Sequence, residues 1–346
     1  MKYSKILLED INDVLHDKSI PWEKFKDSSV LITGATGMIG RGCVRILAQL
    51  NFEKNYNIQI YAMGRNPEKG RRLEVLQGVK FIQADISNPL EIEFPVEYII
   101  HCAAITKSSE MVSNPIGVIE TEILGSKNIL EIALKNKVKG FLYASSMESY
   151  GLLDLSEVKE ADQGYIDLTS PRSSYPMCKR MVELLCNCYY AQHQLRTKVV
   201  RLGMVFGAGE NFMNDNRIWA QFARCIINNE PIELHTTGHS TTSFTYLPDA
   251  LKGIFLTLLS NSCGEVYNVA ASSYMIKEFA ECIADNFNLQ LKMNVPDDIE
   301  KLGYAKEFQL ALNSDKLKAL GWNPQIIKVE EMIRRVIEEF QSQNID

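Results

Sequence analysis

VLITGATGMIGRGCVRIL, residues 30–47, is the stretch that decides the fold. A short apolar run leads into three glycines spaced three apart, and a helical pattern follows. Glycine at a strand-to-helix junction permits a tight turn, lets backbone N–H groups approach a pyrophosphate and lets the helix pack close to the strand. We therefore predict a dinucleotide-binding loop here, with a purely structural glycine turn as the alternative. Its contacts are expected from Gly34, Thr36, Gly37, Met38, Ile39 and Gly40.

Short apolar strands and helix-length segments continue to alternate beyond this loop. Strands are expected at 30–33, 58–63, 79–83, 98–104, 140–146 and 197–203, and helices at 41–50, 115–135 and 174–194. Strands separated by helices imply right-handed crossovers and a parallel sheet covered on both faces. The pattern predicts an α/β fold with a doubly wound, Rossmann-type parallel sheet.

The rhythm changes after about residue 205. Further helices are expected at 217–228, 249–259 and 329–340, with a short strand at 231–236. No linker rich in Pro, Gly or Ser separates the halves, so we expect a smaller C-terminal α/β lobe packed on the first, with substrate held between them. The expected parts are an N-terminal helical extension (1–28), a dinucleotide-binding domain (29–205, with some later segments returning to it) and a mainly substrate-binding lobe (206–346).

Composition excludes several classes of function. The 346 residues carry a net charge of -6 with interspersed signs, so there is no basic stripe for nucleic acid. Acidic residues interrupt the apolar positions of the N-terminus, which therefore predicts neither a signal peptide nor a membrane span. The eight cysteines lack zinc-ligand spacing, and Cys186 and Cys188 would lie on different faces of a helix. We expect a cytoplasmic protein that binds a small molecule and no metal.

The end of the second strand bears on the choice of cofactor. It reads MGRN, residues 63–66, with no acid to bind ribose hydroxyls, and an arginine there accommodates a 2′-phosphate. Arg65 therefore favours NADP over NAD, unless it is only a solvated loop residue. Asp85 and Ile86 follow the third strand, where the adenine would lie. Ala103 and Ala104 follow the fourth, where small side chains leave room for the cofactor.

Tyr175 and Lys179 lie four residues apart, hence on one face of the expected helix 174–194. Ser146 stands at the end of the fifth expected strand, where doubly wound sheets carry functional groups. A lysine near a tyrosine favours the tyrosinate, so we expect the pKa of Tyr175 to move from about 10 toward working pH. A phenolate of that kind takes a hydroxyl proton while a hydride leaves the carbon, and Ser146 holds the same oxygen.

These motifs resemble those of extended short-chain dehydrogenases/reductases of the NAD-dependent epimerase/dehydratase family, which remodel nucleotide sugars. The resemblance covers about residues 30–340, through TGATGMIG, HCAA, SSMESYG, YPMCK, RLGMVFGAG, SFTYLPDA and EVYNVA. It implies that Tyr175 is the base, that Lys179 holds the nicotinamide ribose and that Ser146 binds the reacting hydroxyl. It also implies a transient keto-sugar and return of the hydride from the bound cofactor.

Departures from the family pattern bear on the reaction. Met147 and Glu148 stand where 4,6-dehydratases of the family have an Asp-Glu pair, and a methionine cannot protonate a leaving hydroxyl. Glu148 is therefore a candidate acid or base for an epimerisation, elimination or decarboxylation, or else it only orders its loop. Met204 and Thr242 replace an expected Asn and Arg that contact diphosphate and nucleotide, and Arg217 is a candidate substitute. Glu122 stands where an Asn is frequent.

Two other functions remain open on the sequence. One is an NADPH-dependent carbonyl reductase, which Arg65 and the altered phosphate contacts favour. The other is a catalytically silent dinucleotide-binding protein. A homodimer is also expected, because relatives pack the helix of the Tyr-Lys pair in a dimeric four-helix bundle, and this one carries apolar Met181, Leu184 and Leu185.

Overall fold

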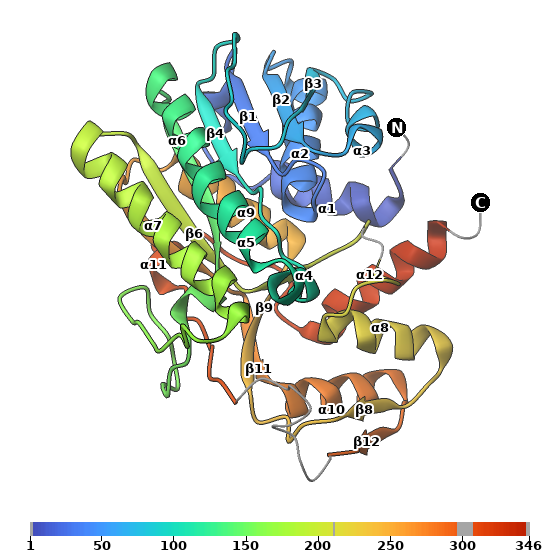
Figure 1. The fold of residues 1–346 in the computed structure, drawn as a ribbon. Coiled ribbons are helices and arrows are strands. Elements are labelled where there is room, and N and C mark those ends of the chain that lie inside the picture. The colour runs from blue at the N-terminus through green and yellow to red at the C-terminus, as the bar shows by residue number, and fades with distance from the viewer. Residues whose placement is uncertain (1–2, 210–211, 296–306, 344–346) are drawn as a thin grey trace.

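The large sheet of the protein has seven parallel strands. The computed structural model describes residues 3–209, 212–295 and 307–343, and orders these strands β10-β6-β5-β4-β1-β2-β3 (Figure 1). All pairs are parallel, as short strands joined by helical crossovers require. The strands are β1 (Ser29–Thr33), β2 (Gln59–Gly64), β3 (Val79–Gln83), β4 (Tyr98–His101), β5 (Gly140–Ser146), β6 (Thr197–Leu202) and β10 (Glu265–Val269).

Helices cover both faces of this sheet. On one face α2 (Met38–Lys54) and α9 (Leu247–Leu259) bury their apolar sides together with the N-terminal helix α1 (Lys5–Leu15). On the other face lie α6 (Gly125–Asn136) and α7 (Ser174–His193). Helix α6 is preceded without a break by α5 (Pro115–Ile119) and a π-helical turn η2 (Glu120–Leu124). The fold is thus the expected doubly wound, Rossmann-type arrangement.

A second lobe has its own apolar core. Around it pack α8 (Ile218–Asn228), α10 (Ile276–Phe287) and α12 (Val329–Gln343), seen at the lower right of Figure 1. Its strands form two small sheets, β11-β9-β7 and β12-β8. These strands are β7 (Met204–Phe206), β8 (Ile232–Leu234), β9 (Thr241–Tyr246), β11 (Ser272–Met275) and β12 (Leu291–Met293).

Short helical segments complete the description. They are η1 (Trp22–Phe25), α3 (Pro67–Arg71), α4 (Ser108–Ser113), η3 (Met147–Tyr150), η4 (Pro171–Ser173) and α11 (Asp315–Lys318). Strand β10 and helix α9 follow residue 205 in the sequence, yet β10 is part of the large sheet and α9 packs on one face of it. They are the later segments that we expected in the dinucleotide-binding domain. We keep the three-part division of the chain, with its boundary at residues 205 and 206, as a proposal.

The expected elements match the observed ones within a few residues, with one correction at the fourth strand. That strand was expected to run to residue 104, but β4 ends at His101. Beyond it the Ala103 N–H donates to the side-chain hydroxyl of Thr33 at 3.2 Å instead of to a strand partner. The chain therefore leaves the ladder early at the carboxyl end of the sheet.

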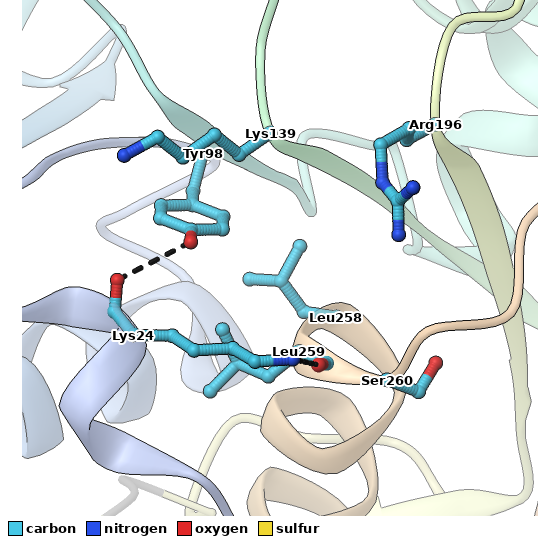
Figure 2. A pocket seen from close by; sticks show the side chains of 7 residues that line it. All are labelled: Lys24, Tyr98, Lys139, Arg196, Leu258, Leu259 and Ser260. Carbon is cyan, nitrogen blue, oxygen red and sulfur yellow. Dashed lines mark hydrogen bonds between the residues drawn. The ribbon is translucent and has the colours of Figure 1, made fainter.

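A surface pocket of about 390 Å³ lies at the other end of the sheet (Figure 2). Tyr98 begins β4, and Lys139 and Arg196 directly precede β5 and β6. The Lys24 ammonium donates to the Leu259 carbonyl, and Lys139 pairs with the carboxylate of Glu97. The pocket is remote from the carboxyl ends of the strands, so it is not part of the site described next.

Candidate active site

The glycine loop fits a dinucleotide by its backbone. Gly34 has φ +64°, and a Cβ there would lie 2.7 Å from backbone atoms of Cys102 and Ala103. A Cβ on Gly40 would lie 2.4 Å from the Gly34 carbonyl oxygen, so helix α2 begins close against the end of β1. Gly37 is the N-cap of α2 and is exposed. The first N–H groups of a helix have no acceptor within it, so Met38 and Ile39 offer donors suited to a pyrophosphate.

The expected adenosine-binding residues lie at neighbouring strand ends. Arg65 follows β2, and its guanidinium is 3.9 Å from the Asp85 carboxylate. Hydrogen bonds from Ser87 are the main reason that the pKa of Asp85 is lowered. Ile86 is buried, whereas the Arg65 side chain is 61 % exposed. The structure thus brings the arginine and the acid together, which reduces the net positive charge available to a 2′-phosphate.

A buried histidine that sequence reasoning missed supports the end of β4. His101 Nδ1 lies 2.6 Å from the Thr33 hydroxyl, and Nε2 lies 2.9 Å from the Ser126 hydroxyl. Burial, with a smaller contribution from Lys179, lowers the pKa of His101 to about 3, so the ring is neutral. This network ties β1, β4 and α6 together beneath Ala103 and Ala104, which are partly exposed where the cofactor is expected.

Tyr175, Lys179 and Ser146 meet at the carboxyl end of β5. Helix α7 carries the tyrosine and the lysine, both of which are buried. The Lys179 ammonium donates to the Ala144 carbonyl at 3.1 Å and lies 5.5 Å from the centre of the Tyr175 ring. Ser146 ends β5, two residues after Ala144. The sequence-predicted trio is therefore gathered at the carboxyl end of one strand.

The expected lowering of the Tyr175 pKa is wrong for the chain by itself. Burial raises the pKa of Tyr175 above its usual value of 10, and the carboxylates of Glu148 and Glu122 raise it further. The hydrogen bond with Ser146 and the charge of Arg172 act in the opposite direction but are weaker. A buried phenol loses the hydration that a phenolate needs, so the neighbouring lysine does not decide the outcome alone.

Glu122, whose role the sequence did not reveal, is one of the groups that add to the effect of burial and of Glu148. It is fully buried on the π-helical turn η2, and its carboxylate lies 3.3 Å from the Lys179 ammonium. The Tyr143 hydroxyl donates to the same carboxylate oxygen at 3.0 Å. The ammonium therefore lies 3.3 Å from a buried carboxylate and 5.5 Å from the centre of the Tyr175 ring.

Comparison with known proteins places this geometry in a family. The model of the NAD dependent epimerase/dehydratase family matches residues 30–270, from the start of the glycine stretch to the end of β10. The chain belongs to that family. It is an enzyme of the extended short-chain dehydrogenase/reductase type, as are its relatives.

Curated relatives extend over nearly the whole chain. UDP-glucuronic acid decarboxylase 1 of Danio rerio is 27 % identical over 318 residues, which cover 90 % of this chain and 72 % of the relative. A dTDP-glucose 4,6-dehydratase of Streptomyces niveus is 22 % identical and covers 89 % and 91 %. Among solved structures, a UDP-N-acetylglucosamine 4-epimerase of Methanobrevibacter ruminantium has a TM-score of 0.76 at 21 % identity, covering 92 % and 99 %. That likeness shows the shared fold.

Two departures from the family pattern touch each other in the structure. The Thr242 hydroxyl in β9 lies 3.6 Å from the Met147 sulfur in η3, and Thr242 is buried. A threonine and a methionine therefore meet where the family pattern has an arginine and an aspartate. Residues 95 positions apart therefore meet here, and neither side chain carries a charge.

Arg217 lies near the third altered position but its charge is already paired. Its guanidinium is 2.5 Å from the Asp215 carboxylate and donates to the Val205 carbonyl in β7 at 3.1 Å, next to Met204. Glu148 is held in a similar way by Arg172, at 2.7 Å, with both side chains about one third exposed. Each arginine carries a partner that a bound anion would have to share or displace.

We also searched the described residues for metal-binding clusters and for membrane-spanning helices. In residues 3–209, 212–295 and 307–343 there is no cluster of three or more His, Cys, Asp or Glu side chains arranged to hold a metal ion. Among the helices of those ranges, none combines the length and the apolar composition needed to cross a bilayer.

Proposed function

We propose that the protein acts on a nucleotide-linked sugar through a transient keto-sugar, with a bound nicotinamide dinucleotide. The observation that carries the proposal is the meeting of Tyr175, Lys179 and Ser146 at the carboxyl end of β5, two strands from the glycine loop after β1. The nicotinamide supplies a place for a hydride to be held and returned. The names of the relatives support a nucleotide sugar as the substrate.

The residues of the chain divide the proton chemistry among them. Ser146 is placed to bind the reacting hydroxyl, and Tyr175 to take its proton as the hydride leaves the same carbon. Lys179 holds the nicotinamide ribose beside the tyrosine. On return of the hydride, Tyr175 gives the proton back to the carbonyl oxygen, so oxidation and reduction at this carbon together need no net acid or base.

The net reaction supported best is decarboxylation of a nucleotide-linked uronic acid. Oxidation at C4 makes the C6 carboxylate part of a β-keto acid, whose C5–C6 bond breaks to release CO₂ and leave an enolate. No hydroxyl leaves, so the absence of an acid at Met147 does not hinder this step. A proton is then added at C5, and Glu148 is the candidate donor. Relatives named UDP-glucuronic acid decarboxylase support this choice.

The direct test is a panel of UDP-, dTDP-, GDP- and CDP-linked hexoses and uronic acids. Products are identified by mass spectrometry, and absorbance follows transient cofactor reduction. We expect a nucleotide pentose and CO₂ from a uronic acid. Unchanged sugars together with steady NADPH consumption on a simple carbonyl compound would select the reductase instead, which the relatives do not favour.

Glutamine in place of Glu148 separates the two halves of this cycle. The variant retains Tyr175, Lys179 and Ser146, so hydride transfer from the sugar should proceed. Without a donor for C5, turnover should fall roughly 10²-fold or more, while reduced cofactor accumulates in the first turnover. Rapid mixing followed at 340 nm measures both. Equal losses in both phases would show that Glu148 only orders its loop through Arg172.

Arg65 favours NADP over NAD in this proposal, because β2 ends without an acid and the arginine side chain is exposed. Alanine at this position should weaken NADP⁺ binding by roughly tenfold and leave NAD⁺ within about twofold, since one charged hydrogen bond is worth about 1.5–3 kcal/mol. Asp85 competes for the guanidinium, so Asp85→Asn is the matched variant and should strengthen NADP⁺ binding. Calorimetric titration measures all three proteins. An unchanged affinity ratio in Arg65→Ala would remove the arginine from the site.

We also propose a homodimer formed through α5 and α7. These helices pack together and leave an apolar surface exposed. Leu185 packs partly into the core instead, so it does not belong to that surface. Sedimentation should give about twice the 39.2 kDa of one chain, and a single 39.2 kDa species at micromolar concentration would refute the dimer. The exposed residues are Ile116, Ile119, Leu124, Met181 and Leu184.

A cytoplasmic location is proposed as well. All eight cysteines are unpaired, and several are buried within apolar cores where they behave as small hydrophobic side chains. Free thiols in this number are typical of a reducing compartment.

A further inference from the structure

Glu122 is the buried charge nearest to the proposed catalytic lysine. Helix 115–136 is α-helical on both sides of η2, and the π turn is the local irregularity that carries this residue. Such turns cost regular hydrogen bonding and are frequent at functional sites. Here the turn faces α7, and the carboxylate meets the Lys179 ammonium at 3.3 Å. The resemblance to the family led us to expect a neutral Asn at this position, so the buried carboxylate departs from that expectation.

We infer that Glu122 is a positioning residue that neutralises Lys179 and thereby raises the pH at which Tyr175 works as a base. The inference deepens the proposed function, in which Tyr175 takes the substrate proton. The Glu122 carboxylate lies 3.3 Å from the Lys179 ammonium and offsets its positive charge. The Tyr175 ring, whose centre is 5.5 Å from the ammonium, therefore experiences the field of an ion pair and not that of a full positive charge. The phenolate then gains less from Lys179 than it would beside a neutral Asn.

The carboxylate form of Glu122 agrees with its contacts. The Lys179 ammonium pairs by charge with the same oxygen to which the Tyr143 hydroxyl donates. The other oxygen, Oε1, is buried and has no hydrogen-bond partner among the residues that the structure describes. A positive charge and a hydroxyl donor at one oxygen suit a carboxylate. A neutral residue of the same shape at position 122 would therefore remove the ion pair with Lys179 and leave the apolar packing largely as it is.

Other ionisable groups around the pair do not replace Glu122. His101 is neutral, and Cys102 and Cys178 have pKa values raised to about 12 by burial. Glu148 also disfavours the Tyr175 phenolate, but Arg172 pairs with it and acts in the opposite direction. Arg180 and Glu183 on the same helix point elsewhere, to the Ser149 carbonyl and to Arg201. The charged groups that face Tyr175 and Lys179 are Glu122, Glu148 and Arg172, and the neutral ones are Tyr143, His101, Cys102 and Cys178.

The test compares Glu122→Gln and Glu122→Asn with Glu131→Gln. Glu131 accepts a hydrogen bond from the Tyr189 hydroxyl further along the same two helices, and because it is exposed and outside the site it serves as a control for the loss of one helix carboxylate. In profiles of kcat/KM against pH on the sugar found by the panel, the midpoint at which activity rises as Tyr175 loses its proton should move to lower pH by about one unit in both Glu122 variants. It should not move in Glu131→Gln. An unmoved or higher midpoint in a folded Glu122 variant overturns the inference.

A second measurement needs neither substrate nor cofactor. In the cofactor-free chain, Glu122→Gln and Lys179→Met should each lower Tm, because each leaves a buried partner unpaired. The double variant should lose less than the sum of the two, since no charge remains. Additive losses would show that the two side chains do not compensate each other and would overturn the inference. If no sugar in the panel reacts, the proposed function fails, while this cycle still reports on the pair.

Discussion

Phenylalanine in place of Tyr175 is expected to lower kcat by roughly 10²- to 10⁴-fold, the usual contribution of a positioned acid or base. The ring is retained, and only its hydroxyl is lost. The ring is almost completely buried, so packing on α7 should persist. Turnover by mass spectrometry and the transient absorbance of reduced cofactor should fall together, because both require removal of the hydroxyl proton.

The control for this variant is Tyr190→Phe, on the same helix but at its far end and outside the site. It should leave kcat within about twofold. Tm and dinucleotide affinity should be nearly unchanged in Tyr175→Phe, which separates a chemical defect from a folding defect. A Tyr175→Phe protein that keeps wild-type turnover would show that another group takes the proton, and the roles assigned to Lys179 and Ser146 would then fall with it.

Much of the fold could be predicted because its information is local. Each strand is a short apolar run, and each covering helix has a recognisable length and periodicity. Gly34 and Gly40 mark the first turn because only glycine fits against the backbone there. The strand that was overestimated, β4, ends where the Thr33 hydroxyl takes over the Ala103 N–H. That is a contact between residues 70 positions apart, which no local pattern records.

The candidate site was predictable only in its residue types. Tyr175, Lys179 and Ser146 follow from spacing and strand-end position, and the structure places them together. The charge on Lys179 could not be judged, because its partner Glu122 lies 57 positions away on a π turn that apolar periodicity does not reveal. The same holds for the contact between Met147 and Thr242, which joins residues 95 positions apart. The expected direction of the Tyr175 pKa was wrong first because the phenol is buried, and then because the carboxylates of Glu148 and Glu122 lie near it, and neither burial nor these neighbours follow from local spacing.

Alanine in place of Gly40 is expected to damage cofactor binding and stability together. Its Cβ would lie 2.4 Å from the Gly34 carbonyl oxygen and 2.9 Å from the Ala35 Cα, both backbone atoms that side-chain rotation cannot move. The start of α2 must therefore shift away from the end of β1. Overpacking of this kind costs about 1–3 kcal/mol in the free energy of unfolding. The helix N-terminus would also leave the position from which its N–H groups reach a pyrophosphate.

Gly42→Ala tests whether it is the backbone contact that matters. Gly42 lies half a turn further along α2, and its new Cβ would meet the side chain of Leu251 at 2.9 Å, which a leucine can relieve by a small rotation. Alanine also gains up to about 1 kcal/mol over glycine inside a helix, so the net stability change should stay within about 1 kcal/mol. Calorimetric titration should show that Gly40→Ala lowers the dinucleotide affinity by roughly tenfold or more, which is equivalent to at least about 1.4 kcal/mol. The affinity of Gly42→Ala should be nearly unchanged. If both variants bind alike, the close packing of α2 on β1 is a structural device, and the dinucleotide is held by other parts of the loop.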